Sequence, residues 1–586
     1  MKYRFLILGL VLSFTFPVLA QADTSSVGDA GKAWEIPNDA DRGQHIFVLN
    51  GTSFGNEVNR GSFLIQSDFV SGQMTDPTCA EFVESKCSTS NFQYRAVLKQ
   101  CLDANSINCL ADFGVIDSKG QKTSAVFQRY FPEKAQNEYT GDLKKNVPSG
   151  GAGSLYQIKS APFTGGDQYY VEAVVTGAGS SQNNQAGIGD FGAFVFPVAK
   201  REVPEIGKDW PNSGISKNTH GKDGNPIGSY GYASPGLITG TSCMIMSTTE
   251  QACLERYGFP SNTTFYMTIR LKTEPSGWLH GRMSNPQIQI SKSQGYSTIE
   301  IQADPIAVPV VYKMYRWDEL PDGLKTKYNP TTGGFLPDSP LGSPASSCPG
   351  GRSGCNADPN QRNTILLPDP YSQSAFDQLR LWLPFIGDKA QAMYGNWSAR
   401  TLSQSETVNA NQCFTGGQGV TGIVTTNSST YSPGPPYLNQ LTNSLDYKVS
   451  APHFATSGEV FKGSYDLLMR SDVARCVYGF TNAPISATIS VSSSDGEASV
   501  ATTIFNESAG WVHLRAAGFT FSSPTISVKI DQKSAPAAPV VVSPSAQSGA
   551  PTASAVKKIS ITCVKGKSTK VVTALKPICP SGYKKK

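Results

Sequence analysis

The sequence predicts a mainly β protein: several β-sandwich-like units stapled by disulfides, with few short helices and a small C-terminal hairpin module. Segments that alternate apolar and polar residues, such as Thr264–Leu271, recur along the chain, and period two is typical of strands with one buried face. Glycine and proline are frequent, and only 16% of the 586 residues are charged. This composition excludes a coiled coil, a helical repeat array and a highly charged disordered protein.

The N-terminus predicts export. Lys2 and Arg4 precede an apolar run from Phe5 to Leu19, and small residues at the −3 and −1 positions suit cleavage before Gln21. The run is shorter than the ~20 residues that a membrane-spanning helix needs, so a signal peptide is favoured over an anchor. No later stretch approaches the length of a spanning segment, and we expect none in the mature chain.

The twelve cysteines fit an exported protein, because an even number favours disulfides in an oxidising compartment. No pair has the two- to four-residue spacing of a zinc site, so we expect neither a metal nor a cofactor. Sequence alone leaves the connectivity open, and our interpretation is pairing between neighbours. The expected pairs are Cys79 with Cys87, Cys101 with Cys109, Cys243 with Cys253, Cys348 with Cys355, Cys413 with Cys476, and Cys563 with Cys579.

The chain divides into nine predicted segments. They are a signal peptide (1–20), a mobile lead (21–42), an N-terminal β domain (43–200), a β domain with the first copy of a repeated motif (201–328), a Pro- and Gly-rich loop (329–370), a helical connection (371–410), a β domain with the second copy (411–533), an Ala/Pro/Ser spacer (534–556) and a basic disulfide hairpin tail (557–586). The spacer has neither charged nor aromatic residues and cannot build a core.

Local signals place strands and helices within these segments. Residues 44–49 read as a strand that ends at the turn dipeptide Asn50-Gly51. The clearest helix follows the loop, with Ser374 as its predicted N-cap and Pro384 as its end. Further short helices are compatible with residues 79–87 and 127–139.

One motif occurs twice. Residues 277–282 read GWLHGR and residues 510–515 read GWVHLR, and each is followed by a P-x-I-x-[IV] segment. Because the chain has only seven Trp and five His, we interpret the two segments as a duplicated β-sandwich-like unit. Alternation along a strand places the Trp, His and Arg of the first copy on one face.

Two interpretations of the motif residues are open. Aromatic, His and Arg side chains side by side could form a ligand face for sugars or anions. In the alternative, which we favour, the Trp is buried and anchors the sandwich, with His and Arg hydrogen-bonded around it. The residues concerned are Trp278, His280, Arg282, Trp511, His513 and Arg515.

The last thirty residues carry nine lysines and no acidic residue, whereas residues 21–556 carry six more acidic than basic residues. Two strand-like runs flank residues 565–568 and predict a hairpin held by one disulfide. A cationic module on a spacer suits an anionic cell-wall polymer or glycan, or anionic lipid, and the alternative is a solubilising tail. No interleaved aromatic residues mark a nucleic-acid groove, so no nucleic acid is expected. Candidate polyanion contacts are Lys565, Lys567, Lys570, Lys584, Lys585 and Lys586.

The tail, together with residues 413–420 and 475–480, resembles uncharacterised exported proteins of actinobacteria, in which a spacer and an ITCxKGK…PxCPxGYKK-like ending recur. The resemblance covers roughly the last third of the chain. It implies an exported, envelope-associated protein, and it transfers no catalytic residue.

No HExxH, Walker, GxSxG or CxxC motif is present, and no residue stands out as catalytic. We therefore expect an exported, envelope-associated structural or binding protein, acting in adhesion or glycan contact, with the tail as a cationic attachment module. The alternative is a secreted glycoside- or ester-type hydrolase that uses the tail for targeting. A hydrolase should show a deep pocket with perturbed carboxylates or His. Self-assembly at the cell surface is a further option.

Overall fold

The computed structural model describes residues 28–29, 31–34, 43–50, 61–67, 78–135, 137–180, 186–202, 243–247, 249–293, 295–328, 345–347, 358–360, 363–417, 419–482, 485–492, 502–521, 524–532, 559–565, 568–574, 579 and 583–585. Strands dominate and the helices are short, which confirms the predicted fold class. The chain forms two compact units, residues 1–533 and residues 534–586, which we call the body and the tail unit. The predicted signal peptide and spacer, and most of the loop 329–370, lie outside the described residues.

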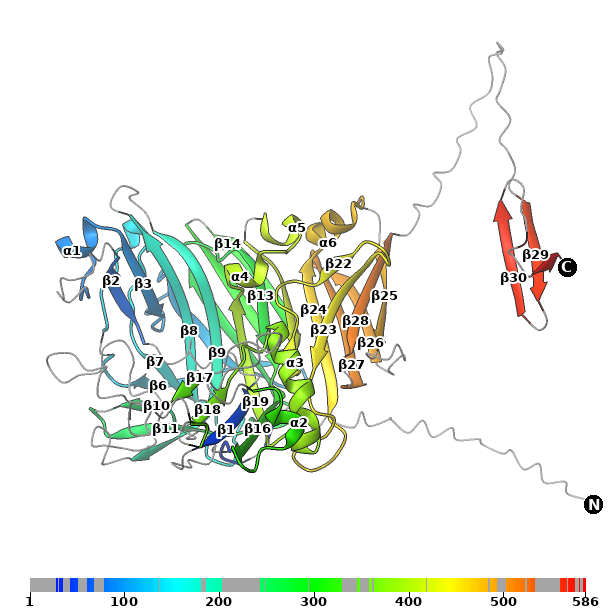
Figure 1. Cartoon of the computed structure of the whole chain (residues 1–586). Coiled ribbons are helices and arrows are strands. Elements are labelled where there is room, and N and C mark those ends of the chain that lie inside the picture. Colours follow the sequence, from blue (N-terminus) through cyan, green and yellow to red (C-terminus); the bar gives the residue numbers. More distant parts are fainter. Residues whose placement is uncertain are drawn as a thin grey trace, which may run out of the picture. The chain divides into compact units, whose positions relative to one another are not determined.

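One large sheet organises the body (Figure 1). In order of pairing, its main run consists of β2 (Phe63–Gln66), β3 (Phe92–Val97), β8 (Gln168–Gly179), β9 (Gly187–Glu202), β19 (Ala392–Thr401), β13 (Gly277–Arg282), β20 (Val420–Thr426), β24 (Lys462–Arg470), β27 (Trp511–Thr520) and β26 (Thr502–Ser508). All of these pairs are antiparallel except β13 with β20, which is parallel.

Three branches extend this sheet. The first is β6 (Val126–Phe131) and β7 (Gly153–Gln157) on β8. The second is β10 (Cys243–Ser247) and β11 (Ala252–Arg256) on β9. The third is β16 (Ile306–Arg316), β1 (Gln44–Asn50), β18 (Asn363–Leu366) and β17 (Ala345–Ser347) on β19.

Two smaller sheets cover the large sheet. One contains β14 (Ser284–Ser293), β15 (Tyr296–Asp304), β12 (Thr264–Leu271), β4 (Cys109–Ile116) and β5 (Lys122–Ser124). The other contains β21 (Thr430–Tyr431), β23 (Ser444–Ser450), β28 (Thr525–Gln532) and β25 (Ile485–Ser492), with β22 (Tyr437–Asn439) on β23. Ile423 of β20 shares a core with Phe265 of the first sheet, and Val424 shares a core with Ile526 of the second. Because neighbouring residues of a strand point to opposite faces, the two sheets cover opposite faces at β20.

The helices of the described part are short. They are α1 (Ser85–Ser88), α2 (Asp322–Lys325), α3 (Gln373–Trp382), α4 (Gln404–Thr407), α5 (Gln412–Thr415) and α6 (Ser471–Tyr478), with the 3-10 turns η2 (Leu143–Lys145) and η5 (Leu383–Ile386). The N-cap of α3 is Ser372, whose hydroxyl accepts from Ala375 N, so the prediction of Ser374 is wrong by two residues. Residues 126–131 form strand β6 rather than a helix. None of the helices in the described ranges is long and apolar enough to cross a membrane.

The segments predicted as consecutive β domains share sheets. β4 lies in segment 43–200 but pairs with β12 of segment 201–328, and β13 pairs with β20 of segment 411–533. Strand pairing therefore crosses the predicted boundaries between the β domains. A sequence pattern shows where a strand lies, but it does not show which distant strand it pairs with.

The predicted helical connection 371–410 contains strand β19 in addition to α3 and α4. Every residue of β19 is buried, because other strands pair with both of its edges and packed layers cover it. A strand covered in this way shows no alternation of apolar and polar residues. The helical interpretation is therefore wrong for Ala392–Thr401.

Residues 28–29 and 31–34, the described part of the predicted mobile lead 21–42, are held against the body. The backbone N–H of Asp29 donates to Met393 O at 2.7 Å, and the N–H of Met393 donates to Asp29 Oδ2 at 3.0 Å. Gly28 has a φ of 80°, and a Cβ atom there would lie 2.7 Å from Met393 O, so this close approach requires glycine. We call residues 28–29 and 31–34 the N-terminal strap.

Three of the predicted disulfides are described: Cys79–Cys87, Cys101–Cys109 and Cys413–Cys476. Cys253 and Cys579 are also disulfide-bonded, and none of the described cysteines is free. The predicted partners Cys243 and Cys563, and the predicted pair Cys348–Cys355, lie outside the residues whose side chains are described.

The tail unit is a three-stranded antiparallel sheet of β30 (Ser568–Ala574), β29 (Ile559–Lys565) and β31 (Lys584–Lys585). β29 and β30 form the predicted hairpin, with Lys565 opposite Ser568 next to the turn. β31 pairs with the other edge of β29, and the sequence patterns did not indicate this strand.

The disulfides should contribute to stability according to the length of chain that each one closes. Cys413–Cys476 joins α5 to α6 across 63 residues, whereas Cys79–Cys87 spans only 8. Chain-entropy arguments give about 4 kcal/mol for the longer loop and about 2.5 kcal/mol for the shorter one. We predict that the double variant Cys413→Ser/Cys476→Ser lowers the free energy of unfolding in urea by more than Cys79→Ser/Cys87→Ser does. An equal or reversed order would contradict this account.

Candidate functional site

The first motif copy lies on β13, in the middle of the body. β19 and β20 pair with its two edges, and no side chain among Trp278, His280 and Arg282 is more than 2% exposed. The Trp278 ring packs edge-on against Phe414 at a centroid distance of 4.9 Å. It lies over Gly422, where a Cβ atom would come within 2.5 Å of the indole. This copy is therefore part of the core and presents no surface to solvent.

His280 and Arg282 both lie against the ring of Tyr431. The His280 ring stacks on it with centroids 4.0 Å apart, and the Arg282 guanidinium lies 4.5 Å above its centroid. Arg282 also donates to the backbone carbonyl of Thr426 at 2.9 Å. Burial, and then the charges of two arginines, hold the pKa of His280 well below its ordinary 6.5, so this imidazole is neutral at pH 7. Burial lowers the pKa of Arg282 to about 10, so this side chain remains cationic.

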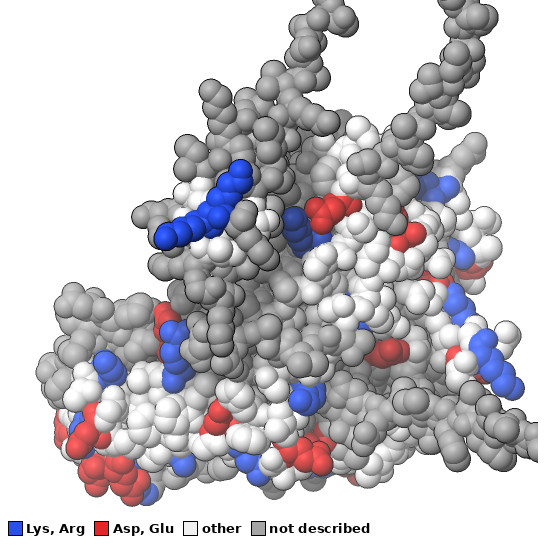
Figure 2. Space-filling view, turned by 90° about the vertical axis from the view of Figure 1, so that its right-hand side faces the viewer, with Lys and Arg blue, Asp and Glu red and all other residues white. Residues whose placement is uncertain are grey.

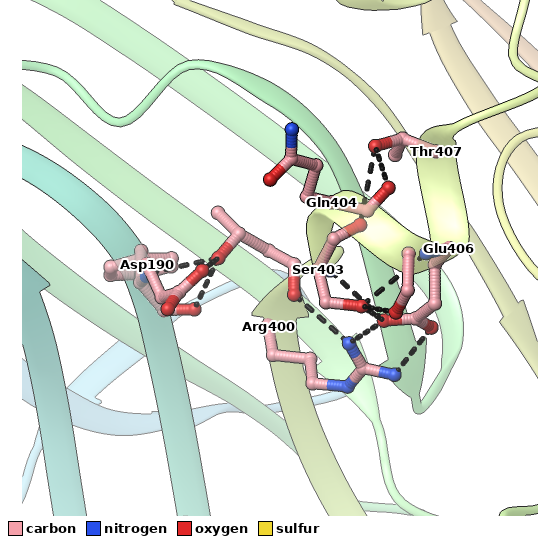
Figure 3. A network of polar contacts seen from close by, with 9 residues as sticks. Asp190, Arg400, Ser403, Gln404, Glu406 and Thr407 are labelled. Carbon is pink, nitrogen blue, oxygen red and sulfur yellow. Dashed lines mark hydrogen bonds and ion pairs between the residues drawn. The ribbon is translucent and has the colours of Figure 1, made fainter.

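Arg400 and Glu406 form a buried ion pair near these residues (Figure 3). Two guanidinium N–H groups donate to the two carboxylate oxygens at 2.7 Å each, which is a bidentate geometry. Glu406 also accepts from the backbone N–H of Ser403 at 3.0 Å and completes a capping box at the start of α4. The hydroxyl of Thr401 lies 3.4 Å from Asp190 Oδ1 of β9. These contacts tie α4 to the large sheet.

The second motif copy lies on β27, in the same sheet, and points to the opposite face. Trp278 lies opposite Gly422 of β20, Gly422 lies opposite Met469 of β24, and Met469 lies opposite Val512 of β27. The register therefore aligns Trp278 with Val512 rather than with Trp511. Because side chains alternate along a strand, Trp511 faces away from the layer that contains Trp278. It packs against the core under the sheet that contains β12, while Trp278 belongs to the core under the sheet that contains β28. The two copies do not form one common ligand face.

His513 and Arg515 share one fully buried carboxylate, Asp466 of β24. His513 Nε2 lies 2.9 Å from Oδ1, and Arg515 Nη1 donates to Oδ2 at 2.7 Å. The backbone N–H of Asn285 donates to the same carboxylate at 3.2 Å, and Arg515 donates to Ser284 Oγ at 2.8 Å. Residues 284 and 285 open β14, directly after the first motif copy. Residues of the second copy and Asp466 are thus hydrogen-bonded to the residues that follow the first copy. We call Asp466, His513, Arg515, Ser284 and Asn285 the Asp466 cluster.

Glu172 on β8 is a buried carboxyl group whose pKa burial raises to about 7. The Tyr170 hydroxyl donates to its Oε1, while Oε2 has no hydrogen-bond partner among the described residues. The adjoining cavity, lined by Phe131, Gly153 and Ile245 among others, holds about 20 Å³. That is room for about one water molecule, whereas substrate pockets usually hold hundreds of Å³. Among the described residues, the cavity beside Glu172 is therefore much smaller than the deep pocket expected of a hydrolase.

The register of the tail unit brings lysines from different parts of its sequence together. Lys570 of β30 and Lys585 of β31 lie opposite Cys563 of β29, one on each side. Lys584 lies opposite Val564, and both lysines of β31 are exposed. Lys565 ends β29, and the candidate residues Lys567 and Lys586 lie outside the described residues.

Charges on the body are arranged differently from those of the tail unit. Over the face drawn in Figure 2, basic and acidic side chains are scattered among uncharged ones. Several of the body's cations are paired with acids, as in Lys122–Glu300 at 2.5 Å and Arg129–Glu250 at 2.9 Å. Within the described ranges, no group of three or more His, Cys, Asp and Glu side chains could hold a metal ion. The tail unit, with lysines and no acids, is therefore the clearest candidate for a charged binding site.

The chain matches no protein-family model, no curated protein and no solved structure. A functional conclusion therefore rests on the residues and geometry of this chain.

Removing the charge of Asp466 should weaken the body. The variant Asp466→Asn keeps the size of the side chain but leaves His513 and Arg515 beside a neutral group. Loss of one partner from a buried charged cluster costs about 3 kcal/mol or more, and we expect a drop of that size in the free energy of unfolding. Asp531→Asn, at an exposed position of β28, is the matched control and should change stability by less than about 0.5 kcal/mol. Equal effects of the two variants would refute the structural role of the Asp466 cluster.

Glu172 should make stability depend on pH. Its pKa of about 7 in the folded protein exceeds the ordinary 4.5, so its contribution is present at acid pH and is lost as pH rises towards 7. The variant Glu172→Gln should gain stability over the native protein by about 2.5 kcal/mol between pH 5 and pH 8. Urea unfolding at both pH values measures this gain. The control Glu133→Gln, at an exposed position, should show none, and a gain that does not change with pH would contradict the account.

Proposed function

We propose that this protein is exported and works at the cell envelope as a binding or structural protein, held by its tail unit on an anionic cell-wall polymer. The observation that carries the proposal is the tail unit itself, a separate compact sheet whose segment contains nine lysines and no acid. The disulfides, and the lack of a membrane-crossing helix in the described part, fit an extracellular protein.

Electrostatics favours a polyanion as the partner of the tail unit. Neighbouring strands of a sheet lie about 4.8 Å apart, so Lys570 and Lys585, on either side of β29, are about 10 Å from each other. No acidic residue of this unit neutralises them. A chain of regularly spaced phosphate or carboxylate groups can contact several such lysines at once and release its counterions.

The spacer suits attachment to a surface. Its 23 residues, with no charge and no aromatic side chain, reach up to about 70 Å if they are extended. A tethered body could therefore explore the space around its anchor. For the body we propose adhesion or glycan contact, in line with the resemblance of the tail to exported actinobacterial proteins.

The experiment measures binding of the full mature chain to purified wall teichoic acid at several salt concentrations. We expect deletion of residues 557–586 to abolish binding. The triple variant Lys570→Gln/Lys584→Gln/Lys585→Gln should weaken binding and reduce the slope of log affinity against log salt by about 2, because each lost contact removes about 0.7.

The matched control replaces three exposed lysines of the body: Lys119, Lys144 and Lys159. These changes should leave both affinity and slope unaltered. Binding that survives deletion of the tail unit would overturn the proposal. Equal or tighter binding to anionic lipid vesicles or to double-stranded DNA than to the wall polymer would overturn the choice of partner.

A further inference from the structure

A groove of about 210 Å³ lies between the N-terminal strap and the loop that leads into β24. We propose that this groove binds one unit of a glycan that carries a protonated amine, such as a de-N-acetylated amino sugar. The inference rests on the glycan contact proposed for the body and deepens it, because it names a groove of the body and a cationic class of glycan; it is separate from the proposed binding of a polyanion by the tail unit.

The groove has the size of a single sugar ring. Its volume is about seven times the ~30 Å³ that a water molecule occupies in the liquid. The accessible part of its apolar lining is mainly Val460, which is 46% exposed, whereas Met393 and Phe461 of the lining are largely buried. Such a lining suits the apolar face of a pyranose ring, whose hydroxyl groups point outward to polar walls.

The polar walls come from the strap and from the loop. Asp29 lines one side, and Thr456, Ser457 and Glu459 line the other. The carboxylates of Asp29 and Glu459 outnumber the one ammonium group of the lining, that of Lys462. The groove therefore has a net negative charge and favours a ligand with an amine over a ligand with an acid. The hydroxyls of Thr456 and Ser457 donate to Asp29 and Glu459, and each can still accept a hydrogen bond from a sugar hydroxyl.

The Asp29 carboxylate is held in place before any ligand arrives. Its Oδ2 accepts from Met393 N at 3.0 Å, and its Oδ1 lies 3.4 Å from the Thr456 hydroxyl. Each carboxylate oxygen has a second lone pair, so both can still accept from a ligand. Because Gly28 fixes the strap closely against β19, a ligand meets a wall that is already in position.

The opposite wall is also ordered. Gly458 N donates to Ala455 O at 2.9 Å and Ala455 N donates to Glu459 O at 2.9 Å, which closes a tight turn around Ser457. At the base of the loop, the backbone N–H of His453 donates to Asp388 Oδ1 at 2.9 Å. The Glu459 side chain is exposed at the rim of the groove, so replacing it should not disturb the fold.

Calorimetric titration of the full mature chain with three tetrasaccharides tests the proposal. We expect the fully de-N-acetylated glucosamine tetramer to bind at least tenfold more tightly than its N-acetylated form and than the β-1,4-glucose tetramer, because only the first carries amines. Glu459→Gln should weaken its binding about tenfold. The matched control Glu202→Gln, at an exposed glutamate outside the groove, should bind as the native protein does.

The lysine-rich tail unit repels this cationic ligand, so the result is independent of the tail's own proposed binding. Equal binding of the three tetrasaccharides, no binding, or an unchanged affinity in Glu459→Gln with an unaltered melting temperature would each overturn the proposal. Lysine amide that binds as tightly as the glucosamine tetramer would overturn the assignment to a glycan.

Discussion

The body depends on one constraint: strand β13 pairs with other strands at both edges, and its side chains are buried. A strand in this position must place Trp278, His280 and Arg282 inside the protein without leaving an uncompensated charge. The structure solves this with a neutral imidazole stacked on Tyr431 and a guanidinium that donates to backbone carbonyls. The same sheet holds the second motif copy, and Asp466 links that copy to the turn after the first.

The protein uses its charges in two ways. Inside the body, Arg400 with Glu406 joins β19 to α4, and Arg515 with Asp466 joins β27 to β24, so these groups are committed to internal contacts. In the tail unit, lysines stand on adjacent strands with no acid to pair with them. In the attached protein that we propose, an uncharged spacer joins the body to the small cationic sheet. The proposed binding element is therefore separate from the core of the body.

Sequence patterns predicted the structural features that depend on residues close together in the chain. Period two identified β12 and β15, two strand-like runs on either side of residues 565–568 identified the hairpin of the tail unit, and neighbouring cysteines identified the described disulfides. β19 was missed because a strand buried on all sides has no alternation. For the first motif copy, alternation placed Trp278, His280 and Arg282 on one face and burial was the favoured interpretation, but the pattern does not show which elements cover that face. The Asp466 cluster could not be predicted, since it depends on the register between β24, β27 and β14. The strap and its groove likewise depend on backbone contacts between residues 29 and 393, which no pattern reveals.

Hydrogen exchange of the full mature chain, followed by mass spectrometry with and without purified wall polymer, tests most directly the claim that the body and the tail unit have separate roles. The account predicts slower exchange on addition of polymer in peptides from residues 559–574, with unchanged exchange in peptides from β13, β20 and β27. Slower exchange in the body while the tail unit stays unchanged would contradict it.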